Sequence, residues 1–136
     1  MLSWGWNTFR ELSNTVTEKE LLNIKKMNCT IPPPEVLKFL PSLPKTAEFS
    51  VIRYQLAKSS TSAGANYEES QSGSSRADFL NKVRISLREM RESNYWLRII
   101  STIQNDNKLV DQLTFLIQES EELKNILGAI VSKSNK

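Results

Sequence analysis

The strongest constraint on the fold is an apolar stripe with helical spacing in the C-terminal part of the chain. Its members are Leu109, Leu113, Leu116, Ser120, Leu123, Leu127 and Ile130. Steps of three and four residues place these side chains on one face of an α-helix, and that face needs a partner surface. Asp106 lies in a turn sequence that offers N-cap chemistry, and Lys133 and Lys136 suit the negative end of the helix dipole. The stripe therefore predicts a helix over residues 107–132.

A second stretch with the same periodicity precedes it. Ser75 offers an N-cap, Asp78 stands at the position that completes a capping box, and no proline or glycine interrupts the residues that follow. The apolar face consists of Leu80, Val83, Leu87, Met90 and Leu97, with Asn94 inside the stripe. We predict a helix over residues 75–103.

A third helix is predicted over residues 46–71, opened by Thr46 after Pro44 and closed near Gly73. Its face is poor in large side chains and consists of Ile52, Leu56, Ser59, Ser60, Ala63 and Tyr67. Small residues on such a face allow a neighbouring helix to approach closely. The alternative is that residues 59–64, which are rich in serine, form a flexible loop.

The N-terminal part of the chain is interrupted by prolines. Residues 17–28 begin with a capping box and continue with apolar residues, which favours a short helix. Residues 32–34 are all proline and must end it. A second short helix is expected from Pro34 or Glu35 to about Leu40, stopped by Pro41 and Pro44. The chain is thus divided into an atypical segment over 1–34, a helical domain over 35–133 and a disordered tail over 134–136.

The composition of the chain excludes several chemistries. Its 136 residues fit one domain and contain no histidine, which removes histidine bases, Ser–His or Cys–His pairs and histidine metal ligands. The four glycines are too scattered for a phosphate-binding loop. We therefore predict no catalytic residue, metal site, cofactor or small-molecule substrate. Cys29 is the only cysteine, and neither a signal peptide nor an apolar run of membrane-spanning length is present, which favours a cytoplasmic protein without membrane contact.

The charge of the chain is concentrated on one face of the helix predicted over 75–103. The net charge of the whole chain is +3, and residues 76–101 alone carry +3. On a helical wheel, the following residues lie within about 80° of one another: Arg84, Arg88, Arg91, Tyr95 and Arg98. Guanidinium groups bind phosphate and a tyrosine can stack on a base, so this face is a candidate site for RNA or DNA. The alternative is a solvated face whose arginines pair with Glu92, Glu119, Glu121 or Glu122.

The same helix carries a second apolar face. It consists of Ile85, Trp96, Ile99 and Ile103. A helix with two separated apolar faces needs two partners. Both partners could be neighbouring helices of the same chain, or one face could be a subunit interface anchored by Trp96. We favour the interface.

Two polar clusters have simpler interpretations. Residues 66–69 (Asn-Tyr-Glu-Glu) could form a polar site, but such a cluster is more often a hydrogen-bonded helix end. Glu119 and Glu122 are adjacent on one helix, but a di-iron type of site would require histidine partners.

Three segments of the chain together resemble one protein family. They are LPKTAEFSVIRYQLAKSSTSAGANYEES (43–70), SRADFLNKVRISLREMRESNYWLRII (75–100) and ESEELKNILGAIVSK (119–133). In order and spacing they are similar to the second, third and fourth helices of the four-helix-bundle proteins encoded in bacterial 23S rRNA intervening sequences. The match spans roughly residues 36–133. Residues 32–34 depart from it, because the first helix of the family runs unbroken where this chain has three prolines.

The resemblance implies an all-α, antiparallel up-and-down four-helix bundle, here with a first helix that is short or broken by prolines. It also implies a homopentamer without known catalytic activity. A related bundle, the accessory protein of diversity-generating retroelements, engages nucleic acid and a reverse transcriptase through a basic pentamer surface. We therefore expect a non-enzymatic homo-oligomer that binds RNA or DNA through its basic helix face. The alternative is a protein-interaction or scaffold module without a nucleic-acid role.

Overall fold

The computed structural model describes residues 33–72 and 75–134, and over these residues the chain is all-α, without a strand. Four α-helices are present in the described part: α3 (Pro33–Phe39), α4 (Ala47–Ser70), α5 (Arg76–Ile103) and α6 (Val110–Ser134). Two 3₁₀ turns, η1 (Leu40–Ser42) and η2 (Asn107–Leu109), follow α3 and precede α6. The predicted fold class is confirmed, and the three long helices match the predicted ranges closely.

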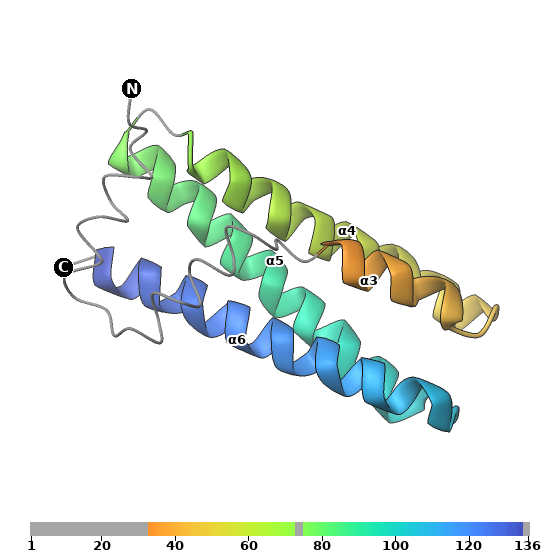
Figure 1. Cartoon of the computed structure of the whole chain (residues 1–136). Helices are drawn as coiled ribbons and strands as arrows, with labels where there is room; N and C mark the ends of the chain where they lie inside the picture. The colour runs from red at the N-terminus through yellow and green to blue at the C-terminus, as the bar shows by residue number, and fades with distance from the viewer. Residues whose placement is uncertain (1–32, 73–74, 135–136) are drawn as a thin grey trace.

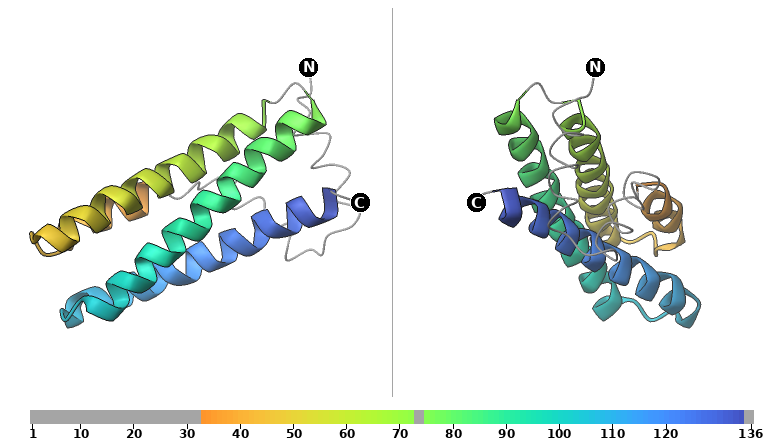
Figure 2. Two further views of the ribbon diagram at one scale, coloured as in Figure 1. Left: turned by 180° about the vertical axis from the view of Figure 1, so that it is seen from behind. Right: turned by 60° about the vertical axis from the view of Figure 1, so that its left-hand side comes forward.

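The helices form an up-and-down bundle in which consecutive helices run antiparallel (Figure 1). The central helix is α5, which packs against both α4 and α6. The short helix α3 contacts α4 and α6 and lies beside only one half of the bundle, as the two views in Figure 2 show. The described part of the first helix is therefore short, as predicted. No helix in the described part of the chain is both long and apolar enough to cross a bilayer.

The helix starts are fixed by the side chains that the sequence indicated. Thr46 Oγ1 accepts a hydrogen bond from the backbone amide of Phe49 at 3.4 Å, and Ser75 Oγ accepts one from the amide of Asp78 at 3.1 Å. In the turn before α6, Asp106 Oδ1 accepts from the amide of Lys108 at 2.9 Å. These bonds satisfy amides that have no partner within the helix.

Small side chains bring α4 and α5 together. The hydroxyls of Ser59 and Ser93 lie 2.8 Å apart, and Ser86 Oγ donates to the carbonyl oxygen of Ala63 at 2.7 Å. All three serines are buried. Residues 59–64 are therefore helical, and the alternative of a flexible loop is wrong. A serine-rich helix is stable here because α5 supplies hydrogen-bond partners and close packing.

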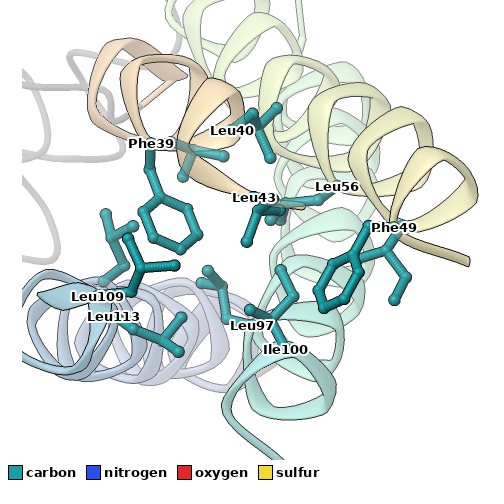
Figure 3. Packing of buried hydrophobic residues seen from close by; sticks show 12 residues of the cluster. Phe39, Leu40, Leu43, Phe49, Leu56, Leu97, Ile100, Leu109 and Leu113 are labelled. Carbon is teal, nitrogen blue, oxygen red and sulfur yellow. The ribbon is translucent and has the colours of Figure 1, made fainter. Parts of the chain in front are cut away.

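The core consists of two clusters along the bundle. The first, called here the α3 cluster, is drawn in Figure 3 and comprises Val36, Phe39, Leu40, Leu43, Phe49, Ile52, Leu56, Leu97, Ile100, Leu109, Leu113 and Leu116. The second, the distal cluster, comprises Ala63, Tyr67, Phe79, Leu80, Val83, Leu87, Met90, Leu123, Ile126, Leu127 and Ile130. The three predicted apolar stripes supply most of the distal cluster and half of the α3 cluster. Phe39 is fully buried, so the region before α4 is part of the bundle.

The predicted boundaries of the helical domain need correction at both ends. Pro33 and Pro34 lie in the first turn of α3 instead of preceding the domain, because a helix needs no amide donor in its first turn. The α-helix α3 ends at Phe39, close to the predicted end near Leu40, and Pro41 lies in the 3₁₀ turn η1 that follows. At the other end, Ser134 is the last residue of α6 and is buried, so it does not belong to a tail. The helix predicted over 17–28 and residues 135–136 lie outside the described residues.

Candidate nucleic-acid interface

The basic residues of α5 lie on the side of the helix that points away from the bundle. Because α4 and α6 cover the opposite side of α5, the polar positions between its buried residues remain at the surface. The exposed set contains all five candidate residues: Arg84, Arg88, Arg91, Tyr95 and Arg98. The structure therefore brings the predicted residues together on one exposed face, called here the basic face.

Two of the carboxylates that could neutralise this face have other partners. Glu92 Oε1 accepts a hydrogen bond from Trp96 Nε1 at 3.2 Å, and Glu121 pairs with Lys124 at 2.8 Å. Arg88 lies 3.8 Å from Glu89, a long ion pair between an exposed arginine and its neighbour in the chain. An exposed pair of this kind contributes little, about 0–1 kcal/mol. In the described part of the chain, neither Arg91 nor Arg98 forms an ion pair with a carboxylate.

Arg98 is held in place by a series of hydrogen bonds through two buried polar side chains. Its Nε donates to Asn94 Oδ1 at 3.0 Å, and Asn94 Nδ2 donates to Ser120 Oγ at 2.9 Å. Asn94 and Ser120 are both buried, and they link α5 to α6. The terminal guanidinium nitrogens of Arg98 donate to no described residue. A positioned guanidinium with unused donors is well suited to an anion.

A cleft between α5 and α6 lies beside this chain of hydrogen bonds. Its volume is about 450 Å³, and it is lined by Arg91, Asn94, Arg98, Lys124, Asn125 and Gly128. The α6 residues of this set were not predicted from the sequence. Gly128 follows Lys124 by four residues and so shares its side of the helix, but only the packing of α6 against α5 shows that both lie opposite the arginines.

Tyr95 adds an aromatic surface to the basic face. It is 47% exposed, and its ring lies edge-on to Trp96, with centroids 5.1 Å apart and an interplanar angle of 69°. An edge-on contact leaves much of the tyrosine ring available for a base to stack on.

The second apolar face of α5 is covered in part by the chain itself. Trp96 and Ile99 are half-buried and pack against the α3 cluster, and Ile85 is also half-buried. Ile103, at the end of α5, remains 41% exposed. Intramolecular packing therefore accounts for part of this face, and the rest of it lies at the surface.

The polar cluster at residues 66–69 is a hydrogen-bonded helix end, as favoured from the sequence. Asn66 Nδ2 donates to the carbonyl oxygen of Ser62 at 2.9 Å, and Glu69 pairs with Lys82 of α5 at 2.7 Å. Tyr67 is buried; burial, with a smaller effect from the charge of Glu68, raises its pKa to about 12. Within the described residues, no group of three or more acidic, cysteine or histidine side chains could hold a metal ion.

Fold and surface together define a small helical bundle whose central helix α5 carries a basic exposed face. The family model for the 23S rRNA-intervening sequence protein matches residues 34–129, and the chain belongs to this family. It is also similar to a solved structure from Bacteroides thetaiotaomicron, a protein of unknown function from the S23 ribosomal protein family. The two chains are 32% identical, with 84% of this chain and 95% of that chain covered and a TM-score of 0.57. No curated protein matches the chain.

Proposed function

We propose that this protein is a cytoplasmic, non-enzymatic binding protein that contacts the phosphate backbone of RNA or DNA through the basic face of α5. The observation that carries the proposal is the position of four arginines on one exposed side of a single helix. Arg91 has no carboxylate partner in the described part of the chain, and Arg98 bonds only to the neutral Asn94. Their charges are therefore available to an external anion.

The spacing of the basic face suits an extended anionic ligand. Arg84 and Arg98 stand fourteen positions apart in the sequence, which at 1.5 Å per residue corresponds to about 21 Å along the helix axis. A nucleic-acid strand offers regularly spaced phosphates over such a distance, whereas a single small anion would meet only one end of the face. Tyr95, between Arg91 and Arg98, supplies a surface on which a base can stack.

The test is fluorescence anisotropy with a labelled oligouridine of about 16 nucleotides, a length that a single binding surface can occupy, and with a DNA duplex. The wild-type protein is compared with the quadruple variant Arg84→Ala/Arg88→Ala/Arg91→Ala/Arg98→Ala. A control variant loses the same charge from exposed positions on other elements: Lys38, Lys45, Lys58 and Lys108, each changed to Ala.

We expect the arginine variant to lose at least about 100-fold in affinity at low salt, since four phosphate contacts are removed. The control should lose much less, because its lysines do not share a face. Equal losses in the two variants, or tight binding by the arginine variant, would refute the proposal. Circular dichroism confirms that each variant is folded.

We also propose that the protein is a homo-oligomer, a pentamer as the family resemblance implies, that associates through the face of Ile85, Trp96, Ile99 and Ile103. The exposure of Ile103, together with that of Val51 at the adjoining end of α4 (58%), supports this part of the proposal. If the protein only docks partner chains, this face is the functional one and nucleic acid plays no role.

Size-exclusion chromatography with light scattering tests the association. Trp96 packs against the core, so the informative variant is Ile103→Asp at the exposed end of the face. We expect an oligomeric wild type and a lower mass for the variant, because a buried unpaired charge is costly. A folded wild-type monomer would rule out the oligomer. An oligomer that binds no oligonucleotide would favour the protein-interaction module.

A further inference from the structure

We infer that the cleft between α5 and α6 is a phosphate-binding subsite, in which Lys124 and Gly128 of α6 complete the site begun by Arg91 and Arg98 of α5. The inference rests on the proposed function and extends it to a second helix. The ligand is a phosphate group of the bound nucleic acid, carried either in the backbone or at the end of the strand.

The charge of the cleft favours an anion. Arg91, Arg98 and Lys124 face it, and the carboxylate that pairs with one of them is Glu121, at 2.8 Å from Lys124. Three cations against one carboxylate leave an excess of positive charge. Lys124 is partly buried, with a side chain 27% exposed, so its charge is screened less than that of a fully exposed lysine.

Asn94, which lines the cleft, holds the side chain of Arg98 in a fixed orientation. Asn94 is only 2% exposed and uses both ends of its amide, accepting from Arg98 and donating to Ser120. This arrangement fixes the guanidinium of Arg98 before a ligand arrives, which lowers the entropy cost of binding. Five of the six lining residues carry charged or amide side chains, which can hydrogen-bond to a polar ligand.

Gly128 keeps the cleft open. A Cβ atom added at this position would meet no atom within 4 Å apart from the helix's own backbone, so the space beside it is unfilled. A glycine within a helix costs about 1 kcal/mol relative to alanine. The volume of about 450 Å³ exceeds what a phosphate needs and falls in the range of common ligand sites. A phosphate with part of its attached sugar fits this space.

The test uses paired substitutions at Gly128. Gly128→Asp places a carboxylate in the cleft, whereas Gly128→Asn adds a side chain of nearly the same shape without the charge. The Cβ atom of either side chain meets no neighbour within 4 Å, apart from the helix's own backbone. Ser132→Asp, at an exposed position one turn further along α6, controls for the general effect of an added negative charge. Each variant is assayed by anisotropy with the labelled oligouridine.

We expect Gly128→Asp to bind the oligouridine at least about ten-fold more weakly than Gly128→Asn, a difference of about 1.4 kcal/mol. Ser132→Asp should lose less than about three-fold, because it lies outside the cleft and is screened by salt. Equal affinities for the Asp and Asn variants at Gly128, with the wild type still binding, would overturn the subsite and leave the proposed function standing. A wild type that binds no oligonucleotide would remove both.

Two strands distinguish the sources of the phosphate. One oligouridine carries a 5′-phosphate and the other a 5′-hydroxyl. A loss in Gly128→Asp confined to the 5′-phosphorylated strand identifies a terminal phosphate as the ligand, and an equal loss with both strands identifies a backbone phosphate. Lys124→Ala gives an independent check: we expect the slope of log affinity against log salt to become shallower by about one, and an unchanged slope would contradict the inference.

Discussion

Asn94 shows how one residue serves both the core and the surface. It stands in the apolar stripe of α5, where its burial would be costly without partners. Its partners are Ser120 of α6 and the guanidinium of Arg98, so a buried amide links helix packing to the orientation of a surface cation. The wheel of α5 alone placed Asn94 in the stripe, but its two partners follow only from the packed structure.

Gly128 gives a prediction about stability. Gly128→Ala should raise the free energy of unfolding by about 0.5–1 kcal/mol, because alanine restricts the unfolded chain and its methyl group meets no neighbour. Urea denaturation followed by circular dichroism measures the change. The reverse change at the next position, Ala129→Gly, is the control and should lower the free energy of unfolding by a similar amount. Destabilisation by Gly128→Ala would mean that the space beside the glycine is filled.

Tyr67 gives a prediction about pH. Its pKa is about 12 in the folded protein, against an ordinary value of 10.0, because burial disfavours the phenolate. Between these values the unfolded chain releases the proton first, so the stabilisation is complete below pH 10 and is lost as the pH rises towards 12. A shift of this size corresponds to about 2–3 kcal/mol.

Tyr67→Phe isolates the effect, since phenylalanine does not titrate. Urea denaturation of both proteins between about pH 8 and 11.5 should show the wild type losing stability more steeply than the variant above pH 10. The other groups that titrate in this range are common to both proteins. Parallel pH profiles would contradict the assignment of a raised pKa to Tyr67.

At the scale of elements, the long helices differ in how far their sequences determine them. In α5 and α6, large apolar residues recur at the helical period, so the helix and its buried face could be predicted together. The face of α4 is small and polar, which left a loop as an alternative. Its packing against α5 supports the helix, because Ser59 bonds to Ser93 and the carbonyl oxygen of Ala63 accepts from Ser86 across the interface.

The α5–α6 cleft could not be predicted for a related reason. A helical wheel of α5 is enough to place its arginines on one face. The position of Lys124 opposite them depends on the register between α5 and α6. That register is set by packing across the whole core, including the bond between Asn94 and Ser120. A single-helix pattern contains no information about it.

The short helix α3 gives a prediction at this scale. Phe39 is fully buried in the α3 cluster, whereas Leu37 on the same helix is 43% exposed. Phe39→Ala should destabilise the protein by about 3–5 kcal/mol, as expected for a large core residue. Leu37→Ala should change stability by no more than about 0.5 kcal/mol, as expected for a surface position. Similar values for both variants, measured by urea denaturation, would show that α3 is not part of the cooperative bundle.

At the scale of the whole molecule, core packing and positive charge lie on opposite sides of α5. One side of α5 packs against α4 and α6, and the other side presents positive charge. Pro33 and Pro34 lie in the first turn of α3 and Pro41 lies within η1, positions where missing amides cost little. The bundle therefore retains its architecture in the family-matched region, residues 34–129.

The salt dependence of oligonucleotide binding tests the central claim most directly. Each phosphate contact releases counterions, so the affinity of the wild type for single-stranded RNA should fall with a slope of about −3 in log affinity against log salt for four contacts. Anisotropy titrations between about 50 and 200 mM NaCl measure this slope. We predict that replacing the four arginines by alanine removes most of it. Binding that is insensitive to salt, or a slope unchanged in the arginine variant, would contradict the account.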